Sequence, residues 1–136
     1  MSEPPIRDDV LDTVRRCVAE SLAVPHGDVT PGSRLVDDLG ADSLDFVDIV
    51  FMLDRELDIR VRETEFNFLT RLDFSSKDVM ENGVLTETVT TRLAEWLPEM
   101  RKLPAGARVT PRQLFSLITV ESICIVTQRA LADRGR

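Results

Sequence analysis

The clearest pattern in the chain is a series of apolar stripes at helical spacing. The first stripe covers residues 10–22 and predicts an amphipathic helix, which should end near Val24. Its members are Val10, Leu11, Val14, Cys17, Val18 and Leu22. Prolines and glycines then crowd residues 25–32, which show no helical period. We therefore expect a long loop that runs to about Asp42.

Two further stripes predict helices in the middle and at the C-terminal end of the chain. The first of these extends from Ser43 to Leu57 and keeps acidic residues largely off its apolar side. The second continues to about Leu131 and starts at Thr119, a residue suited to capping a helix. Just before it, Thr110, Pro111 and Gln113 form a helix-start signal that predicts a brief helix over residues 111–118.

The segment from Arg62 to Val109 has a weaker periodicity but many apolar residues. A short helix is predicted around residues 66–72, and a longer one is predicted to start at Thr86 and to end or kink at Pro98. The apolar residues that need cover are Phe66, Phe68, Leu69, Phe74, Leu93, Trp96 and Leu97. We expect them to form an added helical pair beside the helix that starts at Ser43, because so many apolar side chains are not left in water.

Composition and charge narrow the class of protein. The 136 residues suit a single domain, residues 1–136, with residues 62–109 as an inserted helical segment. Aromatic residues make up only 5% of the chain, so the core is mainly aliphatic and an all-α fold is favoured. The net charge of −7 argues against nucleic acid and favours basic partners and a monomer. Eight acidic residues lie between residues 37 and 58, where Arg55 is the one base.

The two cysteines and the N-terminus bear on the compartment. Cys17 and Cys124 lie inside apolar stripes rather than in a CxxC motif, so we expect buried free thiols and a reducing, cytoplasmic environment. The N-terminus has neither a basic start nor an apolar core of a signal peptide. No apolar run approaches the roughly 20 residues that span a bilayer. We therefore expect no transmembrane segment.

The run from Asp38 to Asp45, with the sequence Asp-Leu-Gly-Ala-Asp-Ser-Leu-Asp, is the most informative stretch of the chain. It places Ser43 at the N-terminus of an acidic helix, where free backbone N–H groups and the helix dipole favour a phosphodiester. Gly40 is expected to permit a tight approach to that helix. Serine is also among the best N-cap residues, so a plain capping role for Ser43 is the alternative interpretation.

This run resembles the modification site of acyl carrier proteins, and the likeness is continuous over residues 35–61. The resemblance implies an up-and-down helical bundle with a long first loop, like that of acyl carriers. It also implies a covalent 4′-phosphopantetheine, derived from coenzyme A, on Ser43 between Asp42 and Leu44. Such a protein is a carrier rather than an enzyme, and it holds acyl groups as thioesters for fatty-acid, lipid or polyketide-type synthesis.

The resemblance further implies which residues meet partner enzymes. These positions are Asp42, Leu44, Asp45, Val47, Asp48 and Phe51. The implied partners are a phosphopantetheinyl transferase and enzymes of the acyl-carrier synthetase, ketosynthase and acyltransferase types, which dock through basic patches. Arg55 departs from the family pattern, because this part of the helix is usually acidic. The departure raises the question of whether partners of the general fatty-acid pathway dock normally.

Other functions remain open on the sequence alone. One is a peptidyl or aminoacyl carrier of a thiol-template pathway, although Gly-Ala-Asp-Ser-Leu favours the acyl type; another is an unmodified helical interaction module. A hydrolase is disfavoured because the chain has no Gly-x-Ser-x-Gly motif and its one histidine, His26, lies in the loop. Asp37, Asp38 and Asp42 lack the alternate spacing of a calcium loop. We therefore predict no catalytic residue and no metal site.

Overall fold

The computed structural model describes residues 5–104 and 106–134, which are mainly helical, as the all-α prediction requires. The three long helices are α1 (Asp8–Leu22), α2 (Ser43–Leu57) and α7 (Val120–Arg134). Shorter helices are α3 (Phe66–Thr70), α4 (Glu87–Leu93), α5 (Pro98–Arg101) and α6 (Pro111–Ser116), with single 3-10 turns η1 (His26–Asp28) and η2 (Val61–Glu63). Two short strands, β1 (Met80–Glu81) and β2 (Val84–Leu85), form a hairpin.

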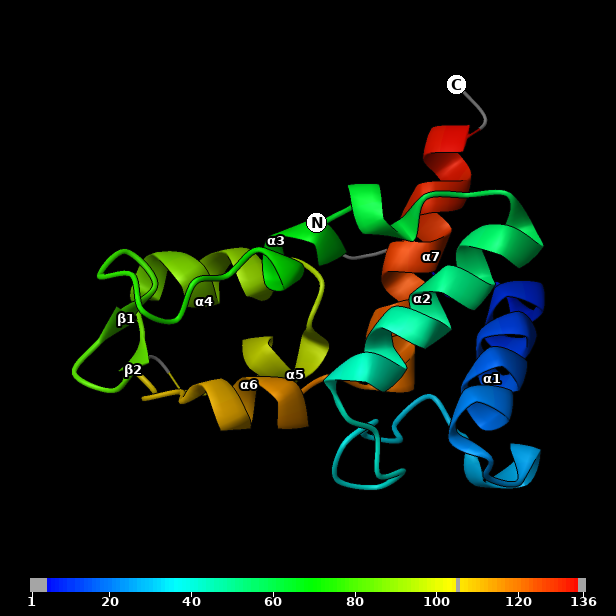
Figure 1. Cartoon of the computed structure of the whole chain (residues 1–136), viewed down its shortest axis with the longest axis horizontal. Helices are drawn as coiled ribbons and strands as arrows, with labels where there is room; N and C mark the ends of the chain where they lie inside the picture. The colour runs from blue at the N-terminus through cyan, green and yellow to red at the C-terminus, as the bar shows by residue number, and fades with distance from the viewer. Residues whose placement is uncertain (1–4, 105, 135–136) are drawn as a thin grey trace.

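Helices α1, α2 and α7 pack together into the carrier bundle, seen on the right of Figure 1. The predicted stripes form its interior: Val14, Cys17 and Val18 of α1 are fully buried, as is Leu53 of α2. Helix α1 ends at Leu22 because Ala23 adopts a left-handed conformation, with φ of 54°. The first helix, the long loop and the start of α2 therefore follow the sequence prediction closely.

Residues 66–116 form a second region, the added lobe, which extends away from the carrier bundle (Figure 1). Its interior contains Leu93, Trp96, Leu97 and Leu114, all fully buried, and the ring of Phe66 meets Trp96 edge-on at 5.9 Å. Most of the apolar side chains that the sequence predicts to be buried are thus buried, whereas Phe74 is exposed. The lobe consists of four short helices and a hairpin rather than the expected helical pair.

The hairpin is a structural element that the hydrophobic pattern did not predict. Asn82 and Gly83 connect its strands, with φ of 55° and 82°, and Met80 pairs with Leu85. Positive φ at both positions matches the right-handed twist of adjoining strands, and Asn-Gly is the dipeptide that adopts it most readily. The strands are only two residues long, too short to show an alternating pattern.

Pro98 has a different role from the predicted one. The helix expected to run from Thr86 toward Pro98 stops at Leu93, and Pro98 occupies the first turn of the separate helix α5. Proline suits that position because its fixed φ is helical and the first N–H groups of a helix need no partner within it. Thr86 precedes α4 as expected, but its hydroxyl donates to the carbonyl of Asp78 (2.8 Å) rather than capping the helix.

The added lobe and the carrier bundle meet along a boundary that we call the seam. Arg34 of the long loop donates to the carbonyl of Ser116 in α6 (3.1 Å) and pairs with Glu99 of α5 (3.4 Å). At the other end of the seam, Arg129 of α7 donates to the carbonyl of Glu95 in the added lobe (2.9 Å) and pairs with Glu65, just before α3 (3.0 Å). The buried side chains of the two regions form one continuous cluster.

Candidate functional site

The loop that leads into α2 is held against the start of α7. The backbone N–H of Leu35 donates to the carbonyl of Ile118 (3.0 Å), and Leu35 is itself fully buried. Gly40 has a φ of 77°, which favours glycine, but a Cβ there would meet no atom within 4 Å. The expectation of a tight approach at Gly40 was therefore wrong: its backbone conformation, rather than a lack of space, explains the glycine.

Helix α2 begins with a reciprocal capping box formed by two acids. The Asp42 carboxylate accepts from the N–H of Asp45 (3.0 Å), and the Asp45 carboxylate accepts from the N–H of Asp42 (2.9 Å). The N-cap is therefore Asp42, and Ser43 is the first residue of the helix. The alternative interpretation of Ser43 as the cap was wrong, and its exposed hydroxyl is available for chemistry.

The surroundings of Ser43 suit a phosphodiester. Among the residues that the structure describes, the backbone N–H groups of Ser43 and Leu44 have no hydrogen-bond partner, as is usual in the first turn of a helix. These donors and the positive end of the helix dipole favour a negative group on the neighbouring hydroxyl. The residues present therefore fit a phosphate-linked group at this position.

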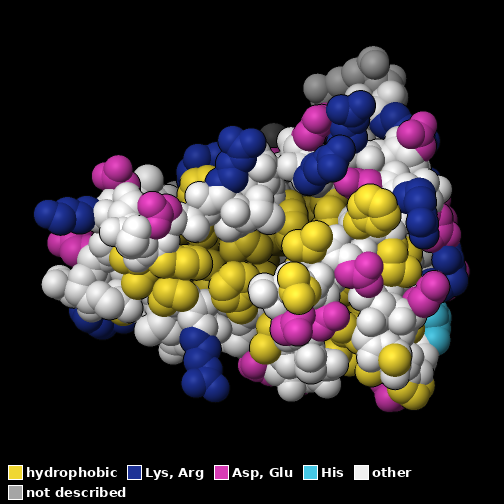
Figure 2. All heavy atoms as spheres, in the orientation of Figure 1, with side chains coloured by type: hydrophobic (Ala, Val, Ile, Leu, Met, Phe, Trp, Pro, Cys, Tyr) yellow, Lys and Arg dark blue, Asp and Glu magenta, His cyan; other side chains and the backbone are white. Residues whose placement is uncertain are grey.

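The outer face of α2 carries a row of exposed apolar side chains. Leu44, Val47 and Phe51 are 76%, 60% and 59% exposed, and their spacing places them on one side of the helix. Figure 2 shows hydrophobic side chains and acids interspersed on this face of the molecule. We call these three residues the apolar row. They are large apolar groups in water, which is typical of a surface that binds a partner.

The acidic residues expected to face partners divide into two kinds. Asp45 is half-buried and its carboxylate belongs to the capping box, whereas Asp48 is exposed and accepts from the hydroxyl of Ser21 in α1 (2.6 Å). The guanidinium of Arg55 lies over the ring of Phe51, 5.7 Å from its centroid. The positive charge of Arg55 therefore lies at the Phe51 end of the apolar row, and the acidic residues lie at the end nearest Ser43.

The two cysteines are free and buried, as predicted. Burial raises the pKa of both the Cys17 and the Cys124 thiols to about 12, so both stay protonated near neutral pH. Within residues 5–104 and 106–134, no group of three or more His, Cys, Asp or Glu side chains is placed to hold a metal ion. In the same part of the chain, no helix has both the length and the apolar character needed to span a bilayer.

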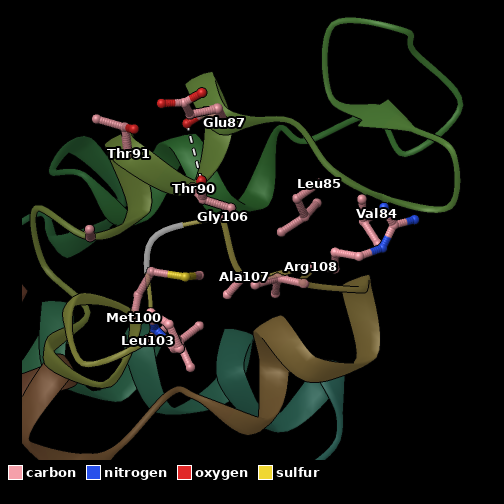
Figure 3. Close-up of a pocket in the computed structure, with 13 residues that line it drawn as sticks. Val84, Leu85, Glu87, Thr90, Thr91, Met100, Leu103, Gly106, Ala107 and Arg108 are labelled. Atoms are coloured by element: carbon pink, nitrogen blue, oxygen red, sulfur yellow. Dashed lines mark hydrogen bonds between the residues drawn. The ribbon is translucent and has the colours of Figure 1, made fainter.

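A cavity of about 480 Å³ lies in the added lobe, away from Ser43. Figure 3 shows Leu85 of the hairpin, Met100 of α5 and Leu103 around it, with Arg108 at its edge. Sequence analysis did not find this cavity, because it is formed by the hairpin, α4 and the segment after α5, which are brought together only by the fold. Ser43 does not line it, so it is not the attachment site.

Comparison with known proteins identifies the class to which this site belongs. Residues 12–76 match the family described as phosphopantetheine attachment site, a match that includes Ser43. The chain is 35% identical over 97 residues to an acyl carrier protein, AcpXL, of Rhizobium meliloti, and this alignment covers 70% of the chain and 93% of that protein. It is also 46% identical over 50 residues to AcpXL of Rhizobium etli, and that alignment covers 37% of the chain and 54% of that relative. No solved structure matches the chain.

The chain belongs to the acyl carrier protein family. The prosthetic group of this family is a covalently attached 4′-phosphopantetheine. The predicted family, the helical fold and the prosthetic group are therefore confirmed.

Proposed function

We propose that Ser43 is the residue to which 4′-phosphopantetheine is attached, and that the chain holds acyl groups as thioesters for fatty-acid, lipid or polyketide-type synthesis. One observation carries the proposal. The carboxylates of Asp42 and Asp45 cap α2 by each accepting from the backbone N–H of the other residue. The hydroxyl of Ser43 is therefore not needed as a cap and stays exposed beside the free N–H groups of the first turn. When bound, the prosthetic group supplies a thiol on a long flexible arm.

The chain's own residues would serve to present Ser43 rather than to catalyse its modification. Leu35 is fully buried and anchors the loop before α2, and Gly40 turns the chain toward that helix. A phosphopantetheinyl transferase would then bring the groups that perform the transfer. Acyl-carrier synthetase, ketosynthase and acyltransferase-type enzymes would approach the same face afterwards.

The apolar row supports a docking role for the outer face of α2. Leu44 and Val47 lie closest to Ser43, with the exposed acids Asp42 and Asp48 beside them. Apolar contacts would supply affinity, and the acids would steer a basic patch toward Ser43. Arg55 over Phe51 would disfavour a cationic group at the far end. We therefore propose that partners dock mainly on the half of α2 nearest Ser43.

The test is intact-mass measurement of the chain during modification by a broad-specificity phosphopantetheinyl transferase. The wild type should gain the mass of one arm, and Ser43→Ala should gain none. Ser75→Ala is the matched control, because Ser75 is also an exposed serine but lies in the added lobe. Full modification of Ser43→Ala would overturn the proposed attachment site.

The same measurement tests docking. Val47→Glu should slow modification, whereas Phe74→Glu should not, because Phe74 is an exposed apolar residue of the added lobe. Equal rates for the two variants would remove the apolar row from the proposal. Loading the modified protein with acyl or with aminoacyl groups would then distinguish an acyl carrier from a peptidyl or aminoacyl carrier. If the wild type gained no arm at all, the unmodified interaction module would be favoured instead.

A further inference from the structure

The cavity of about 480 Å³ in the added lobe has no part in the function proposed above. Leu85, Met100 and Val109 line it and are buried, whereas Ala107 at its edge is exposed. Water finds few polar partners against buried apolar side chains, and an empty space deprives those side chains of contacts. Cavities of this size with mainly apolar linings are typical of sites that bind small ligands. The interior of this cavity therefore fits an apolar group.

Both walls of the cavity are held in place by hydrogen bonds. The backbone N–H of Leu85 donates to the carbonyl of Val109 (2.7 Å), which joins the hairpin to the segment before α6. On the other side, the guanidinium of Arg101 in α5 donates to the carbonyl of Ala94, just after α4 (2.5 Å). Gly106 has a φ of 78°, a conformation that glycine adopts without strain, where the chain turns along the cavity. The fold of the lobe thus builds the cavity from four separate segments.

Arg108 supplies a positive charge at the edge of this apolar cavity. Figure 3 shows its side chain extending beside Val84. Within the described part of the chain, its guanidinium pairs with no acid and has one hydrogen bond, a long one to the carbonyl of Asn82 (3.5 Å). A guanidinium has five N–H donors and stays charged, so most of its donors can meet an anion. Glu87 also lines the cavity, but its carboxylate points away from Leu85 in Figure 3.

We propose that this cavity is a second ligand site, which binds a free amphiphile with an apolar chain and a terminal anionic group, either a carboxylate or a phosphate monoester. The apolar chain lies against Leu85, Met100 and Val109, and the anionic group accepts hydrogen bonds from Arg108. Binding is non-covalent and needs neither Ser43 nor a prosthetic group. The added lobe is then a ligand-binding region, rather than only an elaboration that stabilises the carrier bundle.

Labelled methionine methyl groups can locate the ligand. The chain has four methionines, of which Met100 lines the cavity and Met52 belongs to α2. Protein labelled with ¹³C at these methyl groups is titrated with four probes that share one chain length: octanoate, octyl phosphate, octanol and octylammonium. We expect octanoate or octyl phosphate to shift the Met100 signal to saturation and to leave the Met52 signal unchanged. Met100→Leu assigns the signal.

The probes separate the contributions of the chain and of the charge. The preferred anion should bind about tenfold more tightly than octanol, as expected for a charge-assisted hydrogen bond, and octylammonium should bind more weakly than octanol. Tighter binding of octanoate identifies a carboxylate ligand, and tighter binding of octyl phosphate identifies a phosphate monoester. The inference is overturned if octylammonium binds as tightly as the anions, if no probe shifts the Met100 signal, or if only the Met52 signal shifts.

Substitutions at the edge of the cavity test the role of Arg108. Arg108→Gln should raise the Kd of the preferred anion about tenfold and leave that of octanol unchanged, because it removes the charge but not the apolar lining. Arg112→Gln is the matched control, since Arg112 is also an exposed arginine of the lobe but does not line the cavity. Glu87→Gln should not weaken binding of the anion. Equal weakening of octanol and of the anion by Arg108→Gln would overturn the inference.

Two controls keep these results interpretable. Circular dichroism checks that each variant is folded, and if one is not, the probe series on the wild type still decides. Ser43→Ala separates the inference from the function proposed for Ser43, because this variant should bind the probes as the unmodified wild type does. Loss of probe binding in Ser43→Ala would overturn the inference, whereas a failure to modify Ser43 would count against the proposed function alone.

Discussion

The carrier bundle and the added lobe are stabilised in different ways. The bundle has three helices of 15 residues each, whereas the helices of the lobe have four to seven residues. Helices that short are not stable alone, so the lobe depends on tertiary packing around side chains such as Phe66 and Trp96. The charges also differ: the added lobe, residues 66–116, contains six acids and seven bases, and the rest of the chain contains eighteen acids and ten bases. The excess negative charge thus lies outside the lobe, and the lobe adds apolar volume.

The largest expected effect tests whether the two regions unfold together. Leu53 of the bundle and Leu93 of the lobe are both fully buried, and replacing either with alanine should lower the free energy of unfolding by about 2–5 kcal/mol. Because their buried side chains form one cluster, both variants should show a single transition in denaturant followed by circular dichroism. A separate early transition in Leu93→Ala, with the rest of the helical signal retained, would show that the lobe is an independent unit.

A smaller effect should separate the regions by function. Two capping boxes have the same geometry: Asp42 with Asp45 at the start of α2, and Thr110 with Gln113 at the start of α6. Asp42→Ala and Thr110→Ala should each cost about 0.5–2 kcal/mol of stability. Only Asp42→Ala should slow modification of Ser43, measured by intact mass over time, because Asp42 caps the helix that begins with the serine and is one of the acids proposed to steer partners. Equal slowing by Thr110→Ala would mean that the lobe also controls the site.

The smallest effect concerns pH and lies within the bundle. Arg16 of α1 pairs with Glu56 of α2 and lowers the pKa of Glu56 below its ordinary value of 4.5. A carboxyl group whose pKa is lower in the folded state stabilises the fold fully above its unfolded pKa, and that stability is lost as the pH falls through the folded pKa. The contribution should be under about 1 kcal/mol, because both side chains reach water.

Glu56→Gln provides the measurement for this pair. Its unfolding free energy should fall below that of the wild type at pH 7, and the difference should vanish at a pH below the folded pKa of Glu56. Raised salt should reduce the difference at pH 7, since exposed ion pairs are screened. A difference that persists unchanged in strong acid would assign the effect of the variant to packing rather than to charge.

The bundle was predictable from the sequence for physical reasons that do not hold in the lobe. Helix α2 begins at Ser43 and ends at Leu57 as predicted, because a long apolar stripe and acidic residues at its start define it. In the lobe, Asn82 and Gly83 are a strong local signal for a hairpin, but the flanking strands are too short to show a pattern. The sequence predicts that Pro98 ends or kinks the preceding helix, whereas in the fold Pro98 begins the separate helix α5.

The candidate site was predictable in outline but not in its details. Ser43 and the row of Leu44, Val47 and Phe51 followed from the resemblance, and the structure places these side chains in water. The sequence did not indicate that Asp45 turns back to cap its own helix. Nor did it indicate that the buried indole N–H of Trp96 lacks a hydrogen-bond partner, because this depends on contacts between segments that are distant in the chain.

Arg34 links three parts of the molecule. Its backbone bridges to Thr119 before α7, and its N–H donates to the carboxylate of Asp38 (2.8 Å) in the loop that enters α2. Its side chain reaches Glu99 and Ser116 of the added lobe. A displacement of α5 and α6 would therefore be transmitted through this one residue to the loop that precedes Ser43.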